Sequence, residues 1–237
     1  MKKLFIILIL AYVGFELISL FYNIPFGIDR MNVSKDYLPK SRDVLNVANV
    51  VTAIVVSFRG FDTLGEVTVL FLAAAGVGSI LYRKRTVHTK LNPQRTSPEA
   101  SSILRAGAKI LFPLIILLGA YVFVHGHLTP GGGFQGGAII ATGFLLMLIS
   151  YRKFFVKHSA ITWIESLAGI FFIVIGFAGL VYGSSFLDNV LPSGTLNSLL
   201  SGGVIGIIYV AVGFKVASEL TGLLDTLLNI SQEVEES

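Results

Sequence analysis

Long apolar stretches alternate with short polar ones along most of the chain. Five of these stretches are long enough for a membrane-spanning helix, which needs about 20 mostly apolar residues; they cover residues 62–82, 107–126, 135–151, 160–182 and 198–217. A sixth stretch covers residues 3–22, with Lys2 and Lys3 before its apolar run. A signal peptide starts in the same way, but the run continues past Glu16 and no small-residue cleavage motif follows it, which favours an uncleaved helix.

The stretch 43–58, "DVLNVANVVTAIVVSF", is apolar but short. A run of this length is more typical of an interfacial or re-entrant helix than of a full span. Six spans also satisfy the positive-inside rule, because a seventh span at 43–58 would move the basic cluster 83–85 to the outer face. The pattern therefore predicts an all-α polytopic membrane protein of the cell membrane. It has about six transmembrane helices, one short interfacial or re-entrant helix and both termini in the cytoplasm.

Composition supports the membrane prediction and excludes several classes of chemistry. The chain has 237 residues, of which 54% are hydrophobic and 14% charged, whereas a soluble domain carries about 25% charged residues. Its net charge of +4 comes from short basic clusters beside apolar segments, a pattern that indicates topology rather than nucleic-acid binding. There is no cysteine, which excludes disulfides and iron–sulfur ligation. We see no metal-ligand set and no nucleophile–base arrangement, and we expect no cofactor in this chain.

The sequence "HGHLTPGGGFQGG", residues 125–137, contains the spacing G-x-G-x-x-G. A dinucleotide site would need a strand before it and a helix after it within a βαβ unit, but both flanks are apolar spans, so we expect no nucleotide. The stretch is predicted to be an outer turn between two spans, either packed tightly under a neighbour or lining an ion or water passage. The residues of this outer-turn motif are His125, His127, Pro130, Gly131, Gly132, Gly133, Gln135, Gly136 and Gly137.

The two histidines of this motif are two positions apart, so a helix would direct them to different sides. This spacing argues against a metal pair. A titrating or hydrogen-bonding role at the outer membrane surface remains open for either, because imidazole changes charge near physiological pH.

Ionisable residues inside spans are costly and indicate function. The densest group lies in "FRGFDTLGE", residues 58–66, where helical spacing would place Arg59, Asp62 and Glu66 on one face. Two neighbouring carboxylates beside an arginine are one arrangement for a proton or cation relay. The alternative is a helix start, where the carboxylates complement the helix dipole and Thr63 helps to cap the helix. The sequence leaves both interpretations open.

Glu165 lies inside a predicted span, and Lys109 and Lys215 lie at a similar depth in the preceding and following spans. Each lysine is long enough to extend to the interface, whereas the shorter glutamate needs a partner inside. Lys109 or Lys215 is the nearest candidate by depth, and Glu219 offers Lys215 a local pair one turn away. We therefore add Lys109, Glu165 and Lys215 to the ion-pathway candidates Arg59, Asp62 and Glu66.

Two parts of the chain resemble known families. The glycine turn followed by "AIIATGF" resembles the MrpB (MnhB) subunit of multisubunit Na⁺/H⁺ antiporters, and the similarity extends over residues 100–217. Residues 49–83 resemble the C-terminal extension of the MrpA antiporter subunit and the matching small subunit (MbhE-like) of archaeal membrane-bound hydrogenases. The chain thus resembles a fusion of these two subunits, as in archaeal complex I-related oxidoreductases of the sulfane sulfur reductase (MBX/MBS) type.

The resemblance implies three regions: an MrpA C-terminal-like module over 1–85, a cytoplasmic linker over 86–104 and an MrpB-like four-helix module over 105–237. The linker sequence is polar and contains two prolines. The resemblance also implies a role in Na⁺ and H⁺ exchange within a lipid bilayer. The partners it implies are other Mrp-type antiporter subunits and complex I-like membrane subunits.

We therefore predict a non-catalytic membrane subunit of a Na⁺/H⁺ antiporter module within an archaeal respiratory-type oxidoreductase complex. Any redox chemistry would belong to partner chains. The alternatives are a subunit of a stand-alone Mrp-type antiporter, a purely structural bracing subunit, and a self-sufficient small transporter. Internal symmetry between two halves would favour the last, and we see none.

Overall fold

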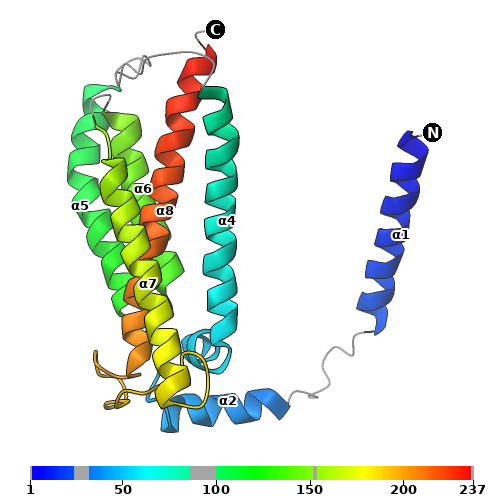
Figure 1. Ribbon diagram of the computed structural model, residues 1–237, viewed down its shortest axis with the longest axis vertical. Helices are drawn as coiled ribbons and strands as arrows, with labels where there is room; N and C mark the ends of the chain where they lie inside the picture. Colours follow the sequence, from blue (N-terminus) through cyan, green and yellow to red (C-terminus); the bar gives the residue numbers. More distant parts are fainter. Residues whose placement is uncertain (1, 24–31, 86–99, 152–153, 236–237) are drawn as a thin grey trace. The chain divides into compact units, whose positions relative to one another are not determined.

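The computed structural model describes residues 2–23, 32–85, 100–151 and 154–235, and within these residues every regular element is a helix (Figure 1). This confirms the all-α prediction. The chain divides into two compact units, Met1–Asp36 and Tyr37–Ser237. Most of the predicted linker, residues 86–99, lies outside the described residues.

The first unit contains helix α1 (Lys2–Asn23), which continues past Glu16 as the sequence predicts. At 1.5 Å per residue its 22 residues extend about 33 Å, enough to cross a bilayer core of about 30 Å. Apolar side chains such as Phe15 and Ile18 are exposed along it. The apolar stretch found among the described residues of α1, Ile9–Ser19, is shorter than a full span, so the sixth crossing stays a prediction.

The second unit is a bundle of five long helices, each of which has a segment long and apolar enough to cross a membrane. This confirms the multi-pass prediction for these five stretches. The helices are α4 (Gly60–Arg85), α5 (Ser102–Val124), α6 (Gly133–Ser150), α7 (His158–Tyr182) and α8 (Val204–Glu235).

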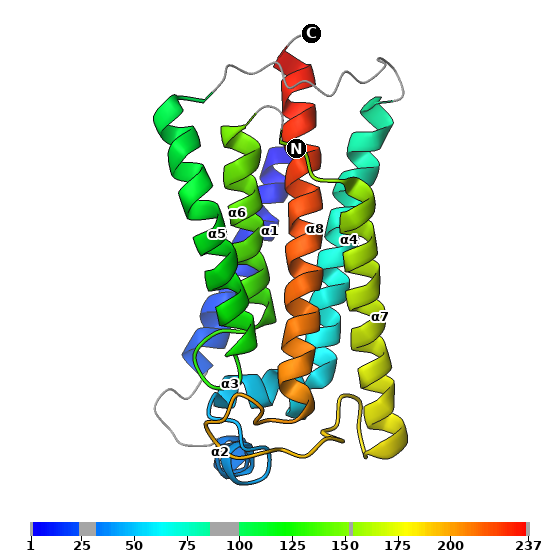
Figure 2. The same cartoon turned by 90° about the vertical axis from the view of Figure 1, so that its left-hand side faces the viewer.

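Helix α8 is the centre of this bundle (Figure 2) and packs against α4, α5, α6 and α7. Of the apolar segment of α8, 72% is buried, compared with 11% for α4 and 17% for each of α5 and α7. The outer helices therefore leave most of their apolar surface open to lipid or to other subunits. This mostly buried central helix is where an ionisable side chain is most shielded from water.

The glycines of α6 allow this close packing. A Cβ at Gly136 would lie 2.6 Å from the carbonyl oxygen of Gly119 on α5, and one at Gly137 would lie 2.7 Å from Val216 Cβ on α8. Such distances exclude any side chain, so two neighbouring glycines bring α6 against α5 on one side and α8 on the other. Small residues at such contacts are typical of membrane helix packing. For these two glycines the structure supports the packing interpretation of the motif.

Two predicted helix boundaries are wrong. The stretch 43–58 is not one helix: residues 44–49 are irregular, α3 begins at Val50, and a π-helix, η1, covers Ala53–Phe58. The last span does not begin at 198, because Gly202 and Gly203 adopt positive φ angles of 78° and 56°, which end regular helix geometry.

A further helix, α2 (Asn32–Asp43), was not predicted, because it is polar on average and carries Pro39. Helix α8 also continues to Glu235, well beyond the apolar stretch from which its end was predicted. Both misses have the same cause: apolar periodicity says little about helices, or parts of helices, that do not bury an apolar face.

Candidate ion-translocation site

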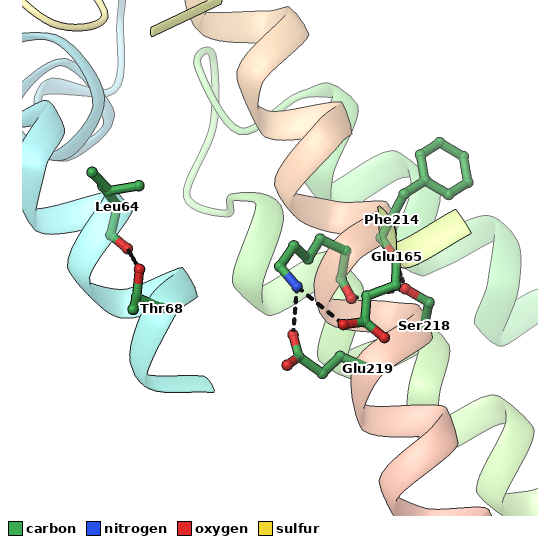
Figure 3. A network of polar contacts seen from close by, with 7 residues as sticks. Leu64, Thr68, Glu165, Phe214, Ser218 and Glu219 are labelled. Carbon is green, nitrogen blue, oxygen red and sulfur yellow. Dashed lines mark hydrogen bonds and ion pairs between the residues drawn. The ribbon is translucent and has the colours of Figure 1, made fainter. Parts of the chain in front are cut away.

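Three ionisable side chains meet inside the bundle between α7 and α8. Lys215 Nζ lies 3.1 Å from Glu219 Oε2 and 3.4 Å from Glu165 Oε1, so one ammonium group joins two carboxylates (Figure 3). We call these residues the Lys215 triad. The side chains of Lys215 and Glu219 are 9% and 2% exposed, and that of Glu165 is 24% exposed. Of the two partners predicted for Glu165, Lys109 and Lys215, the structure pairs it with Lys215, and Glu219 completes the cluster.

The helices determine this geometry. Lys215 and Glu219 are one turn apart on α8, so both point to the same side, and α7 presents Glu165 there. Lys215 lies within one residue of the midpoint of the apolar stretch Val204–Leu228. At that depth its side chain is far from either interface, and it is paired inside instead of extending to water. From α4, the Phe71 ring lies beneath the ammonium, with Nζ 5.3 Å from the ring centroid, a cation–π contact.

Lys109, the other candidate partner for Glu165, takes no part in the Lys215 triad. It is exposed on α5, with Nζ 5.7 Å from the centroid of the Tyr151 ring. The structure therefore decides between the two lysines in favour of Lys215.

The candidates at the start of α4 are only partly brought together. Arg59 Nη2 lies 2.6 Å from Asp62 Oδ2, with side-chain exposures of 59% and 41%. Glu66 is exposed further along α4, and no ion pair among the described residues includes it. Arg59 precedes α4 as the C-terminal cap of η1, so the assumed helical spacing does not apply to it. Thr63 does not cap the helix: its Oγ1 donates to the Val55 carbonyl, 2.7 Å away.

The outer-turn motif is held by a polar cluster that the sequence analysis missed. Asn49 Nδ2 donates to the carbonyls of Gly126 (2.8 Å) and Thr129 (2.9 Å). Thr52 Oγ1 donates to the same Gly126 carbonyl at 2.7 Å, and the Tyr209 hydroxyl donates to Thr52 Oγ1 at 2.9 Å. The segment before α4 and the α5–α6 turn thus share hydrogen bonds at the end of the bundle where α6 and α8 begin.

One local signal pointed to part of this cluster. Asn49 stands immediately before the short helix, where its Oδ1 accepts from the Thr52 amide at 3.4 Å. Asparagine before an apolar run is a helix-start signal. Its bonds to residues about 80 positions away have no such local signature.

The two histidines of the motif have different environments. His125 stacks on Tyr121, with ring centroids 4.3 Å apart. His127 is 1% exposed, and neither of its ring nitrogens has a hydrogen-bond partner among the described residues. Burial lowers the pKa of His127; the backbone of Ser198 and Leu199, close but outside hydrogen-bonding geometry, opposes this shift in part. The folded protein therefore binds a proton at His127 less readily than the unfolded chain does.

This burial predicts a loss of stability in mild acid. The unfolded chain binds a proton at His127 near pH 6.5, the ordinary value, whereas the folded chain resists it. The free energy of unfolding should thus fall below that pH by at most about 1.4 kcal/mol per pH unit for one proton. Replacing His127 with asparagine should remove this part of the slope. Thermal unfolding midpoints of the purified assembly between pH 7.5 and 5 measure the effect. His125→Asn is the matched control and should keep the parent slope.

A multi-pass helical bundle with a buried lysine–carboxylate cluster defines a class: membrane subunits with ionisable groups inside their spans, a feature of ion-translocating proteins. Comparison with protein families makes this specific. Residues 103–222 match the family described as a domain related to the MnhB subunit of Na⁺/H⁺ antiporter, and residues 1–97 match the MbhE family, described as the E subunit of MBH. The chain belongs to the MnhB family and carries an MbhE domain before the MnhB domain.

Solved structures and a curated relative agree with this assignment. The chain is 42% identical to a chain in the structure of the membrane-bound sulfane sulfur reductase, an archaeal respiratory membrane complex. That match covers 96% of this chain and 98% of that one, with a TM-score of 0.80. A chain of the Mrp complex from Dietzia sp. DQ12-45-1b is 28% identical over 95% of this chain, with a TM-score of 0.75, but only 26% of that chain is covered. The B subunit of the Na⁺/H⁺ antiporter of Bacillus subtilis is 33% identical over 38% of this chain and 56% of that protein.

Proposed function

We propose that this chain is a non-catalytic membrane subunit of a Na⁺/H⁺ antiporter module within an archaeal respiratory-type oxidoreductase complex. One observation carries this proposal: the match to a chain of the sulfane sulfur reductase complex extends over nearly the full length of both chains. The match to the Mrp complex covers this chain equally well but leaves most of the longer Mrp chain unmatched. This difference in coverage supports the respiratory complex over the stand-alone Mrp-type antiporter.

In this proposal the chain contributes to Na⁺ and H⁺ translocation and needs other antiporter and complex I-like subunits around it. The Lys215 triad supports a contribution beyond bracing, because charges at the middle of a span are costly and are retained for function. The exposed apolar faces of α4, α5 and α7 support contact with neighbouring subunits and lipid. Electron transfer and its cofactors belong to partner chains.

Isolation of the assembly tests the proposal. An affinity tag on this chain in its native host should copurify antiporter subunits together with redox subunits that carry iron–sulfur clusters. The reconstituted assembly should couple electron transfer to Na⁺ and H⁺ movement, and the chain reconstituted alone should exchange no Na⁺ for H⁺. Copurification of antiporter subunits without redox subunits would support the stand-alone Mrp-type antiporter instead. Exchange by the isolated chain would contradict the subunit proposal.

The orientation in the membrane gives a separate prediction. If both termini and the linker face the cytoplasm, then Thr89→Cys in the linker and Ser193→Cys in the α7–α8 loop lie on opposite sides. A membrane-impermeant thiol reagent added to intact cells should label Ser193→Cys only, and added to inverted vesicles it should label Thr89→Cys only. The chain has no cysteine of its own, so the parent protein is an unlabelled control. Labelling of both variants from one side would contradict the six-span topology.

A further inference from the structure

We propose that the Lys215 triad is a proton-binding site that holds one exchangeable proton, centred on Glu219. The proposal deepens the function above, because it names the ion that this chain binds and the group that binds it. Its starting point is the second oxygen of the Glu219 carboxylate. Oε2 is paired with Lys215, but Oε1 is buried and has no hydrogen-bond partner among the described residues.

The charges of the triad do not balance without a bound cation. One ammonium and two ionised carboxylates sum to one negative charge, and this charge would lie beside the middle of the most buried helix of the bundle. Isolated charge in such surroundings is strongly disfavoured, and buried groups neutralise instead. Addition of one proton to a carboxylate makes the cluster neutral: the proton bonds to Glu219, while the Lys215 ammonium remains paired with ionised Glu165.

Among the side chains that the structure describes, no further charged group forms an ion pair with the triad. Helix α8 packs against four helices, of which α6 has no charged residue or histidine. From α4 the contact with the ammonium is the aromatic ring of Phe71. On α5, Lys109 lies over Tyr151 instead. The remaining ionisable residues of the packed helices lie elsewhere along the same helices: Asp62, Glu66, Arg83, Lys84, Arg85, Arg105, His158, Asp225, Glu233 and Glu235.

The geometry favours a proton over a sodium ion. Hard cations take several oxygen ligands, and transporters supply many of them as backbone carbonyls from unwound helix segments. Here α7 and α8 are continuous helices through the site, and the hydroxyl of Ser218, next to Glu219 in the chain, donates to the carbonyls of Phe214 and Lys215. Among the described residues, no group of three or more His, Cys, Asp or Glu is placed to hold a metal ion. A single free carboxylate oxygen is enough for a proton.

The carboxylates of Glu219 and Glu165 differ in burial, and this difference gives proton exchange at the site a direction. Glu219 is almost completely buried, whereas the side chain of Glu165 on α7 is 24% exposed. The shared ammonium links them, so a proton that leaves Glu219 can pass to Glu165 while Lys215 pairs with the newly ionised Glu219. The net charge of the triad does not change during this transfer. Glu165 is thus the group through which a neighbouring subunit or water exchanges the proton.

Infrared difference spectroscopy of the intact assembly tests the proposal. A protonated carboxyl has a C=O stretch that is separate from the ionised form and shifts in D₂O. The parent assembly should show this band, and Glu219→Gln, which keeps the shape and neutrality of the protonated group, should lose it. Glu165→Gln should lose it as well, because Lys215 then pairs with ionised Glu219 and the cluster is neutral without a proton. Glu66→Gln removes a carboxyl outside the triad and should keep the band.

The outcomes separate this proposal from the proposed function. A band that survives both triad substitutions, or one that is absent from the parent, overturns the proton site even if the assembly still exchanges Na⁺ for H⁺. Replacement of K⁺ by Na⁺ in the buffer tests sodium binding at the same site. If this replacement shifts the ionised carboxylate bands, and Glu219→Gln abolishes the shift, the site binds sodium and the proposal is overturned. If the band behaves as expected but no redox subunit copurifies, the proton site stands and the respiratory assignment fails.

Discussion

Replacing Lys215 with methionine should destabilise the subunit strongly, because it leaves two carboxylates inside the bundle without their shared cation. Removing one partner of a buried ion pair costs about 3–5 kcal/mol. In a domain of this size that corresponds to a fall in the unfolding midpoint on the order of 10 °C. We expect the variant to accumulate at low levels in the membrane and to assemble poorly, as measured by thermal unfolding and size-exclusion profiles of the purified assembly.

Two further variants show whether the loss comes from charge. Lys109→Met removes an exposed lysine that makes a cation–π contact with Tyr151, so we expect a change of about 1 kcal/mol or less. The combination Lys215→Met, Glu165→Gln and Glu219→Gln removes all three charges together and should recover most of the stability, since neutral replacements of a buried ion cluster are often tolerated. If Lys215→Met alone were as stable as the parent, the triad would not be a buried charge cluster.

The membrane character of the fold was predictable because it depends on local composition. A span needs only sufficient apolar length, and the stretches that became α4 to α8 have it. The start of α8 was not predictable in the same way, because the turn before it depends on the backbone conformation of Gly202 and Gly203 and not on hydropathy. The polar helix α2 was also not predictable from hydropathy, because it has no long apolar stretch.

The Lys215 triad shows which contacts can be predicted from the depth of a residue along its helix and which cannot. Depth along the helices limited the predicted partners of Glu165 to Lys109 and Lys215, because a buried carboxylate needs a cation at its own depth, but the choice of Lys215 required the structure. The contribution of Phe71 could not be predicted, since it depends on the rotation of α4 about its axis, which tertiary packing determines. The exposure of Glu66 could not be predicted for the same reason: a helical wheel places it on the face of Asp62 but does not say whether that face points into the bundle.

The glycine motif raised two questions: whether it binds a dinucleotide, and whether it is a packed turn or the wall of a passage. The sequence could answer only the first. The apolar flanks were enough to exclude a dinucleotide site. The choice between a packed turn and a passage wall required the positions of the neighbouring helices. Those positions show that Gly136 contacts α5 and Gly137 contacts α8, while Asn49 holds the turn from a segment about 80 residues earlier.

The same contacts lead to a second large effect: Gly136→Val should prevent α5 and α6 from packing together. A Cβ at this position would lie 2.6 Å from the Gly119 carbonyl oxygen and 2.9 Å from both the backbone nitrogen and Cβ of Phe123. These are backbone or near-backbone atoms, which cannot move without displacing α5 itself. Overpacking of a close contact typically costs about 1–3 kcal/mol and can cost more, and we expect the upper end or beyond here, with Gly136→Ala intermediate.

The measurement for Gly136→Val is the amount of assembled complex in the membrane and its thermal midpoint. Gly107→Val on α5 is the matched control, since no atom lies within 4 Å of the position that its Cβ would take. In a helix, replacing glycine with a residue that has a side chain is by itself neutral or favourable, so the control should match the parent or exceed it. Equal stability of Gly136→Val and Gly107→Val would show that α5 and α6 are not held at this distance. The glycines of the motif would then have to be explained by the alternative interpretation, a backbone-lined passage for ions or water.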